Sequence, residues 1–212
     1  MNWINYSNLK GSHALISPSS SFRWLDYDEG KLTDAVYSSL ATKRGTVLHE
    51  LACDLISNNI KLNKSDRHII QLELSRNDIP SACMDISTAM DVLTPYVNDC
   101  IGFRMSPEVV LYYSNNCFGT TDAICFRNGY LRIHDLKTGS TPPHMEQLIF
   151  YAALFCLNYN EKPNAITTEL RIYKRDEVLV HSPTPDDIKD YMDKIVEADK
   201  IVQKVFEREG RA

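Results

Sequence analysis

This chain of 212 residues has no apolar run that approaches the roughly 18 residues needed to span a membrane. Its first residues, MNWINYSNLKGSHAL, lack the charged-then-apolar layout of a signal peptide. We therefore expect a protein that has no membrane partner and stays in the cytoplasm. The G-x-S-x-G pattern of a serine hydrolase is also missing, which argues against a small-molecule hydrolase on an unrelated fold.

Clustered cysteines are missing too. The six cysteines are scattered and form no C-x-x-C pair. Zinc and iron–sulfur sites need grouped cysteine ligands, so we predict neither and expect free thiols. The net charge of -5 argues against a protein that coats nucleic acid through its overall field. A local basic cleft beside acidic metal ligands remains compatible with this charge.

The apolar spacing predicts a mixture of helices and strands. A short helix with Phe22, Trp24 and Leu25 is expected after the Ser-Pro-Ser-Ser segment at 17–20. The elements expected after it are helices at 34–60, 65–76 and 84–100, strands at 108–113, 119–126 and 130–137, a helix at 142–158, a strand at 167–174 and a helix at 185–209.

This order predicts an α/β or α+β fold in which a central, mostly antiparallel mixed sheet is flanked by helices. We expect a single domain over residues 1–212. Its parts would be a mainly helical segment at 1–105, a sheet with its crossover helix at 106–175, and a C-terminal helix at 184–210.

The segment FGTTDAICFRNGYLRIHDLKTG, residues 118–139, predicts a β-hairpin. Asn128-Gly129 between two apolar runs favours a type I′ turn, because both residues tolerate positive φ. With these two residues as the loop, Asp122 is expected opposite Asp135, beside an apolar floor that includes Ile124 and Ile133. Lys137 would then lie on the same face as Asp135.

Two opposed carboxylates repel each other unless they share a proton or hold a cation. Hard divalent cations such as Mg²⁺ take carboxylates, backbone carbonyls and water as ligands. Asp122, Asp135 and Lys137 around a cation would suit phosphodiester cleavage: the cation stabilises charge and lowers the pKa of water, and the lysine orients that water or steadies the phosphate. A solvated salt-bridge edge is the alternative interpretation of the same three residues.

The Asp122 and Asp135-Leu136-Lys137 pattern resembles the core motif of the PD-(D/E)XK nuclease superfamily. The likeness extends to the RecB-like exonuclease branch, which includes phage proteins. There GTVLHELA (45–52) resembles the helix with the metal-binding histidine, EQLIFYAALF (146–155) resembles the Gln-x-x-x-Tyr helix, and HALISPSSSFRWL (13–25) resembles the opening of phage members. The resemblance covers about residues 13–175 and implies a restriction-endonuclease-like core.

The resemblance also implies roles for individual residues. Lys137 would be the catalytic lysine, and Gln147 and Tyr151 would contact DNA or brace that lysine. Glu108 is a further candidate ligand. The implied ligands for Mg²⁺ or Mn²⁺ are His49, Asp122, Asp135 and the backbone carbonyl of Leu136. Without the other motifs, the favoured interpretation of His49 is a helix residue packed against the sheet, and that of Gln147 and Tyr151 is core and boundary positions of an apolar helix.

The chain departs from the family pattern at several positions. Thr121 stands where the motif name has proline, and Asp135 fills a slot often held by glutamate. Relatives that bind an iron–sulfur cluster have a cysteine near the place of Tyr27 and three more near the C-terminus, whereas no cysteine follows Cys156 here. We therefore expect no iron–sulfur cluster. We read His134 as structural, since it alternates to the face opposite Asp135.

The resulting hypothesis is a Mg²⁺- or Mn²⁺-dependent DNA nuclease. An exonuclease acting on linear ends is favoured over a sequence-specific endonuclease, because no zinc-finger or recognition-helix module is visible. The alternative is an inactive nucleic-acid-binding or host-interaction protein on the same fold. DNA is the expected partner. A homo-oligomer or a recombination partner protein is left open.

Overall fold

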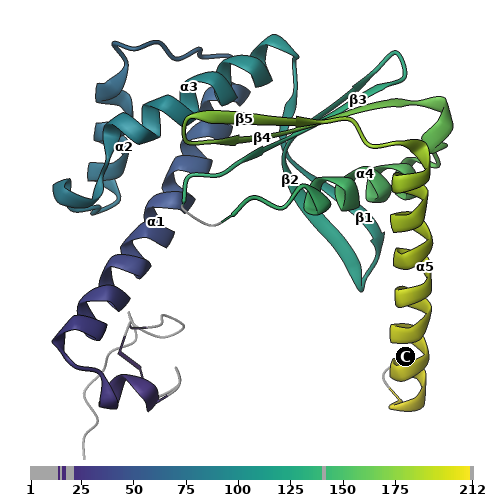
Figure 1. Ribbon diagram of the computed structural model, residues 1–212, viewed down its shortest axis with the longest axis horizontal. Coiled ribbons are helices and arrows are strands. Elements are labelled where there is room, and N and C mark those ends of the chain that lie inside the picture. The colour runs from purple at the N-terminus through teal and green to yellow at the C-terminus, as the bar shows by residue number, and fades with distance from the viewer. Residues whose placement is uncertain (1–13, 15, 18–21, 140–141, 211–212) are drawn as a thin grey trace, which may run out of the picture.

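One mixed five-stranded sheet, with helices on both faces, forms the centre of the molecule (Figure 1). The computed structural model describes residues 14, 16–17, 22–139 and 142–210. Most of the predicted cap segment at 17–20 lies outside the described residues. In Figure 1, α1 (Glu29–Ser57) and α5 (Pro185–Arg208) descend on the two sides of the sheet and give the molecule the shape of an arch. The predicted α+β class is confirmed.

Polar residues set where the long helices begin. The Asp28 carboxylate accepts a hydrogen bond from the Lys31 amide at 2.8 Å, so α1 begins before the predicted Asp34. Thr184 and Asp187 form a reciprocal capping box at the start of α5. The other helical segments are η2 (Phe22–Asp26), α2 (Arg67–Arg76), η3 (Ser81–Cys83), α3 (Ile86–Gly102), α4 (Met145–Tyr159) and η4 (Pro163–Ala165).

The strands lie in the sheet in their sequence order. They are β1 (Ser106–Ser114), β2 (Cys117–Arg127), β3 (Tyr130–Leu136), β4 (Thr167–Lys174) and β5 (Glu177–His181). Only β3 and β4 pair in parallel, and α4 is the crossover between them. The sequence did not predict β5, because it is a short edge strand whose side chains are mostly exposed.

The predicted hairpin register is confirmed over most of its length. Arg127 pairs with Tyr130, and the ladder continues in the same register to Ala123 opposite His134. Asn128 and Gly129 have φ values of +52° and +73°, as a type I′ turn requires. The ladder ends one step before Asp122, which makes a different contact described below.

The regular alternation of β2 side chains between the two faces of the sheet breaks at Asp122. Thr121 pairs with Val109, which packs on the α4 side, whereas Ala123 belongs to the core on the α1 side. Residues two apart in a regular strand face the same side, so the alternation breaks between them. Glu108, which the register sets opposite Asp122, has a φ of +51° and leaves the extended conformation. A local distortion of this kind turns a side chain away from its regular direction.

Two separate cores cover the two faces of the sheet. Apolar residues of α1, α2 and α3 pack with Ala123, Cys125, Leu136 and Tyr173 on one face. Those of α4 and α5 pack on the other face, against residues such as Ile133 and Leu170. In the described part of the chain, no helix combines the length and apolarity that crossing a bilayer requires.

His134 lies inside the first core. Its ring centroid lies 5.7 Å from that of Phe103 and 5.2 Å from that of Tyr173, and its side chain is fully buried. Burial, together with the charges of Arg171 and Arg132, lowers the pKa of His134 from 6.5 to about 3. The prediction that His134 is a structural residue is confirmed.

This burial predicts an acid sensitivity of the fold. Below pH 6.5 the unfolded chain binds a proton at His134, whereas the folded chain binds none until pH is near 3. The free energy of unfolding should therefore fall over that interval, by up to about 1.4 kcal/mol per pH unit. In His134→Leu the fall should be shallower, as measured by urea unfolding at a series of pH values. Equal slopes in the two proteins would contradict this assignment.

Candidate active site

Asp122 lies where α1, β2 and β3 meet. Its Oδ2 accepts a hydrogen bond from the Leu136 amide at 2.7 Å and lies 3.6 Å from Nδ1 of His49. The contact with Leu136 ties the carboxylate to the strand that carries Asp135. The break in β2 therefore places Asp122 between the helix and the neighbouring strand, and the backbone of Leu136 lies against it.

Asp135 and Lys137 form a close pair at the end of β3. The Lys137 ammonium lies 3.0 Å from both carboxylate oxygens and donates a hydrogen bond to Oδ1. Oδ2 is buried and accepts no hydrogen bond of good geometry. The Lys137 amide donates to the Tyr173 carbonyl at 2.8 Å, so pairing with β4 fixes the backbone beneath the lysine.

The surroundings of Asp135 destabilise the charged form of its carboxyl group. Burial, and then the nearby Asp122 carboxylate, raise the pKa of Asp135, and Lys137 and His49 only partly oppose them. A carboxyl group whose pKa is raised by burial and by a second acid is a common feature of functional sites. A divalent cation would relieve both causes at once.

Helix α4 supplies the two predicted supporting residues. Gln147 Oε1 lies 3.4 Å from the Lys137 ammonium. The Tyr151 hydroxyl donates to the Thr120 carbonyl at 2.7 Å. A Cβ at Gly119 would lie only 3.0 Å from the Tyr151 ring, so the glycine permits this close approach. Gln147 thus reaches the lysine, while Tyr151 holds the helix against β2.

Glu108 lies beside α1. Burial and the charge of the Glu108 carboxylate raise the pKa of the Cys53 thiol, which places Glu108 next to that residue. Cys53 follows His49 by one helical turn. The structure therefore brings Glu108 to the same side as His49, although its own side chain is exposed.

Arg44 of α1 also contributes to the site. Its guanidinium donates to the Thr138 carbonyl at 3.1 Å, directly after Lys137. A Cβ on the adjacent Gly45 would lie 3.3 Å from the Thr138 hydroxyl. Arg44 therefore anchors the chain that follows Lys137. Only a spatial contact reveals this role, because the two residues lie far apart in sequence.

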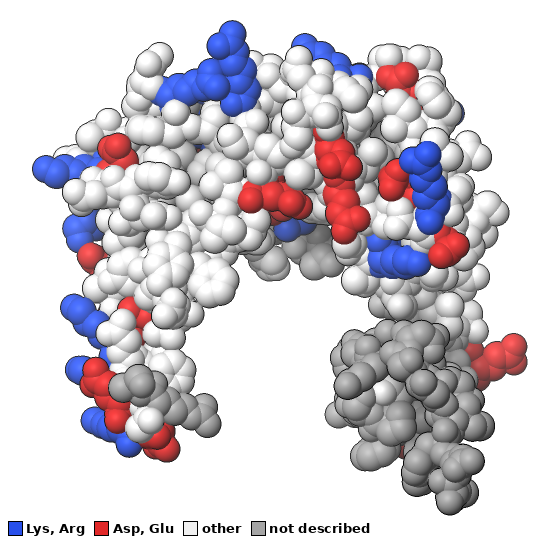
Figure 2. Space-filling model, turned by 180° about the vertical axis from the view of Figure 1, so that it is seen from behind, with Lys and Arg blue, Asp and Glu red and all other residues white. Residues whose placement is uncertain are grey.

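Acidic side chains lie together near the top of the hollow between α1 and α5 (Figure 2). Among the described residues, no three His, Cys, Asp or Glu side chains already surround one point as metal ligands. The present partners account for this, because Asp122 bonds to the Leu136 amide and Asp135 bonds to Lys137. The donor set nevertheless suits Mg²⁺ or Mn²⁺: two carboxylates, one of them with a buried oxygen that accepts no hydrogen bond, beside an imidazole and a backbone segment.

The model of one protein family matches residues 13–159, which is more than half of the chain. The chain belongs to this family, described as "protein of unknown function (DUF2800)". Searches among curated proteins and among solved structures found no match. The candidate site residues, from Arg44 to Tyr151, fall within the matched segment, whereas β4, β5 and α5 follow it.

Because the charged form of Asp135 destabilises the folded protein, we expect that removing this charge increases the free energy of unfolding. The pKa of Asp135 is raised by folding, so the charged form destabilises the folded protein above that pKa and the penalty disappears in acid. Asp135→Asn should therefore unfold at a higher urea concentration than the wild type at neutral pH, and the difference should vanish at low pH.

Asp199→Asn is the matched control, because Asp199 is equally buried but satisfied. Its carboxylate accepts hydrogen bonds from Ser114, Asn116 and Gln203 at 2.7, 3.0 and 2.7 Å. Substitution there should destabilise the protein, since charge-assisted hydrogen bonds are lost. A loss of stability in Asp135→Asn like that of the control would refute the prediction.

Proposed function

We propose that this protein is a metal-dependent nuclease that hydrolyses phosphodiester bonds in DNA. The observation that carries the proposal is the meeting of Asp122, Asp135 and Lys137. They come from two strands and contact His49 of α1 and Gln147 of α4. A solvated salt-bridge edge fits these residues less well, because Asp135 is buried and one of its oxygens has no hydrogen bond.

The metal would be held by Asp122 and Asp135, with His49, the Leu136 carbonyl and Glu108 as further donors. Bound there, Mg²⁺ or Mn²⁺ would stabilise negative charge on the phosphate and lower the pKa of water. Mg²⁺ usually retains several waters and takes only one or two carboxylates, so this set is sufficient.

The remaining residues have roles that follow from their contacts. The Lys137 ammonium, held 3.0 Å from Asp135, would donate hydrogen bonds to a phosphate oxygen or to the attacking water. Gln147 limits the positions that this ammonium can take. Tyr151 and Arg44 position the backbone on either side, through Thr120 and Thr138.

We further propose that the enzyme acts at the ends of linear DNA. This preference rests on the sequence, which contains no module that reads bases in a groove. We also propose that the protein acts in the cytoplasm, which would be the cytoplasm of the host cell if the chain is virus-encoded.

The first test is cleavage. The wild type should degrade end-labelled linear DNA with Mg²⁺ or Mn²⁺ and leave closed circles intact. Lys137→Ala and Asp122→Ala should reduce the rate by about 100-fold or more, as expected when charge stabilisation at a reacting centre is lost. Lys64→Ala, which removes an exposed lysine elsewhere, is the control and should cleave normally. Unchanged cleavage by Lys137→Ala would defeat the mechanism, and cutting of circles would defeat the preference for ends.

Metal binding can be tested without any cleavage. Isothermal calorimetry should detect Mn²⁺ binding to the wild type and to Lys137→Ala, but not to Asp135→Ala, because only the last variant loses a proposed ligand. Equal binding by Asp135→Ala would remove Asp135 from the ligand set. DNA binding in a wild type that binds no Mn²⁺ would favour the inactive nucleic-acid-binding alternative.

A further inference from the structure

Two clefts with different linings lie beside the candidate active site. One has a volume of about 780 Å³, and its lining includes Lys137. The other has a volume of about 360 Å³, and its lining includes Gln147, whose Oε1 lies 3.4 Å from the Lys137 ammonium. The Lys137–Gln147 contact therefore separates the two clefts.

The charged residues that line the larger cleft are mainly basic. Besides Lys137, its lining includes Arg44 of α1 and Lys174 and Arg175 at the end of β4, with one acid, Asp85. Lys174 pairs with Glu177 of β5 at 2.8 Å, and Arg175 pairs with the adjacent Asp176 at 3.4 Å. Such exposed pairs contribute little, so a phosphate can replace the acid at small cost. This cleft suits a phosphate backbone that leads to Lys137.

The smaller cleft is aromatic. Its lining includes four aromatic residues, namely Phe118, Phe150, Tyr151 and Tyr191. Phe118 is 60% exposed and Phe150 is 37% exposed. Tyr151 is held in place by its hydrogen bond to Thr120 and by its contact with Gly119. A flat apolar ring is what such a cleft accommodates best, because aromatic rings stack face to face or edge to face.

A phosphate track and an aromatic cleft on either side of one lysine are the two parts of a site for single-stranded nucleic acid. In a duplex the faces of the bases are covered by their neighbours, so only an unpaired base can enter an aromatic cleft. We propose that the substrate is a single strand or an unpaired end, with one base in the aromatic cleft and its backbone along the basic cleft. This inference rests on the nuclease function proposed above.

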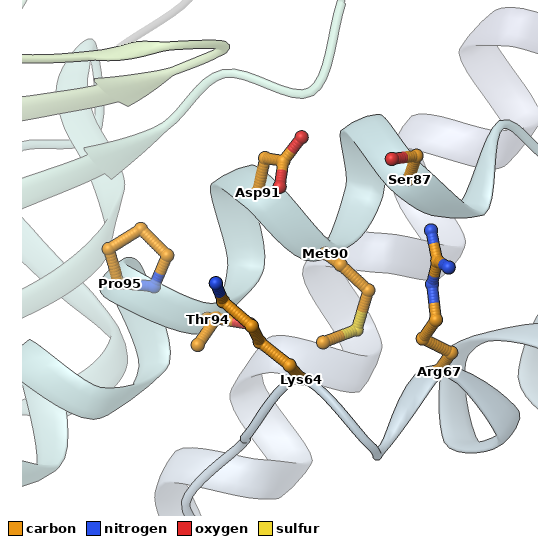
Figure 3. Close-up of a pocket in the computed structure, with 7 residues that line it drawn as sticks. All are labelled: Lys64, Arg67, Ser87, Met90, Asp91, Thr94 and Pro95. Carbon is orange, nitrogen blue, oxygen red and sulfur yellow. The ribbon is translucent and has the colours of Figure 1, made fainter.

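The cleft shown in Figure 3 provides a contrast. It lies between the start of α2 and α3, and Lys64 and Arg67 extend along it beside Met90. Its lining includes Asp91, contains no aromatic residue and shares no residue with the clefts beside Lys137. Its basic residues therefore serve as controls for those of the phosphate track.

The experiment measures binding of a fluorescent oligodeoxythymidylate without divalent cations, so that no cleavage occurs. The wild type should bind it more tightly than a duplex of equal length. Phe150→Ala should bind it about 5- to 100-fold more weakly, as expected for one lost base–aromatic stack, and Phe150→Trp should restore binding. Phe206→Ala is the matched control: Phe206 is 38% exposed, lines a different cleft and should bind normally.

Binding of an oligomer with abasic sites distinguishes contacts to the bases from contacts to the backbone, because only the backbone contacts remain. It should bind more weakly than the intact oligomer to the wild type, but not to Phe150→Ala. Lys174→Ala should weaken both oligomers equally and lower the salt dependence of binding, because it removes a phosphate contact. Lys64→Ala should change neither.

Unchanged affinity in Phe150→Ala, or a wild-type preference for duplex, would overturn the single-strand proposal. If the protein nevertheless cleaved duplex DNA and this cleavage required Lys137, the proposed nuclease function would still be supported. Single-strand binding that depends on Phe150, in a protein with no cleavage, would support the binding site and refute the nuclease. If Phe150→Ala altered self-association but not DNA affinity, the cleft would belong to a second copy and the proposal would fail.

Discussion

Repulsion between the Asp122 and Asp135 carboxylates is the interaction on which the surrounding structure depends. Burial of Asp135 is the main cause that raises the pKa of its carboxyl group, and the charge of Asp122 raises that pKa further. Donors from several elements contact the two carboxylates. The Leu136 amide and His49 contact Asp122, and Lys137 contacts Asp135. Without Lys137 the buried Asp135 carboxylate would be an unpaired charge, which costs several kcal/mol.

The distortion of β2 follows from the same requirement. In a regular ladder the two acids would stand directly opposite each other, where like charges destabilise a sheet. Instead the ladder ends at Ala123, and Asp122 takes the Leu136 amide as its partner. Glu108 has left-handed backbone in the neighbouring strand, at the place where that strand would otherwise face Asp122. The strain there is confined to the site and leaves the rest of the hairpin regular.

Local signals explain which features the sequence could predict. Asn128-Gly129 sets the hairpin register through its turn chemistry, and the helix periods follow from their apolar faces, so both were found. The break at Asp122 was missed, because a glutamate such as Glu108 carries no sequence signal for positive φ. The anchoring of Thr138 by Arg44 was missed because it joins α1 to the end of β3, and only the tertiary fold brings those elements together.

Helix α4 connects the parallel strands β3 and β4, and it also carries Gln147 and Tyr151. Parallel pairing across a helix is a non-local contact, and such contacts form slowly because a long loop must close first. The lysine lies at the far end of that pairing, where its amide bonds to Tyr173. The backbone position of Lys137 therefore depends on a contact between segments that are distant in sequence, as well as on its own strand.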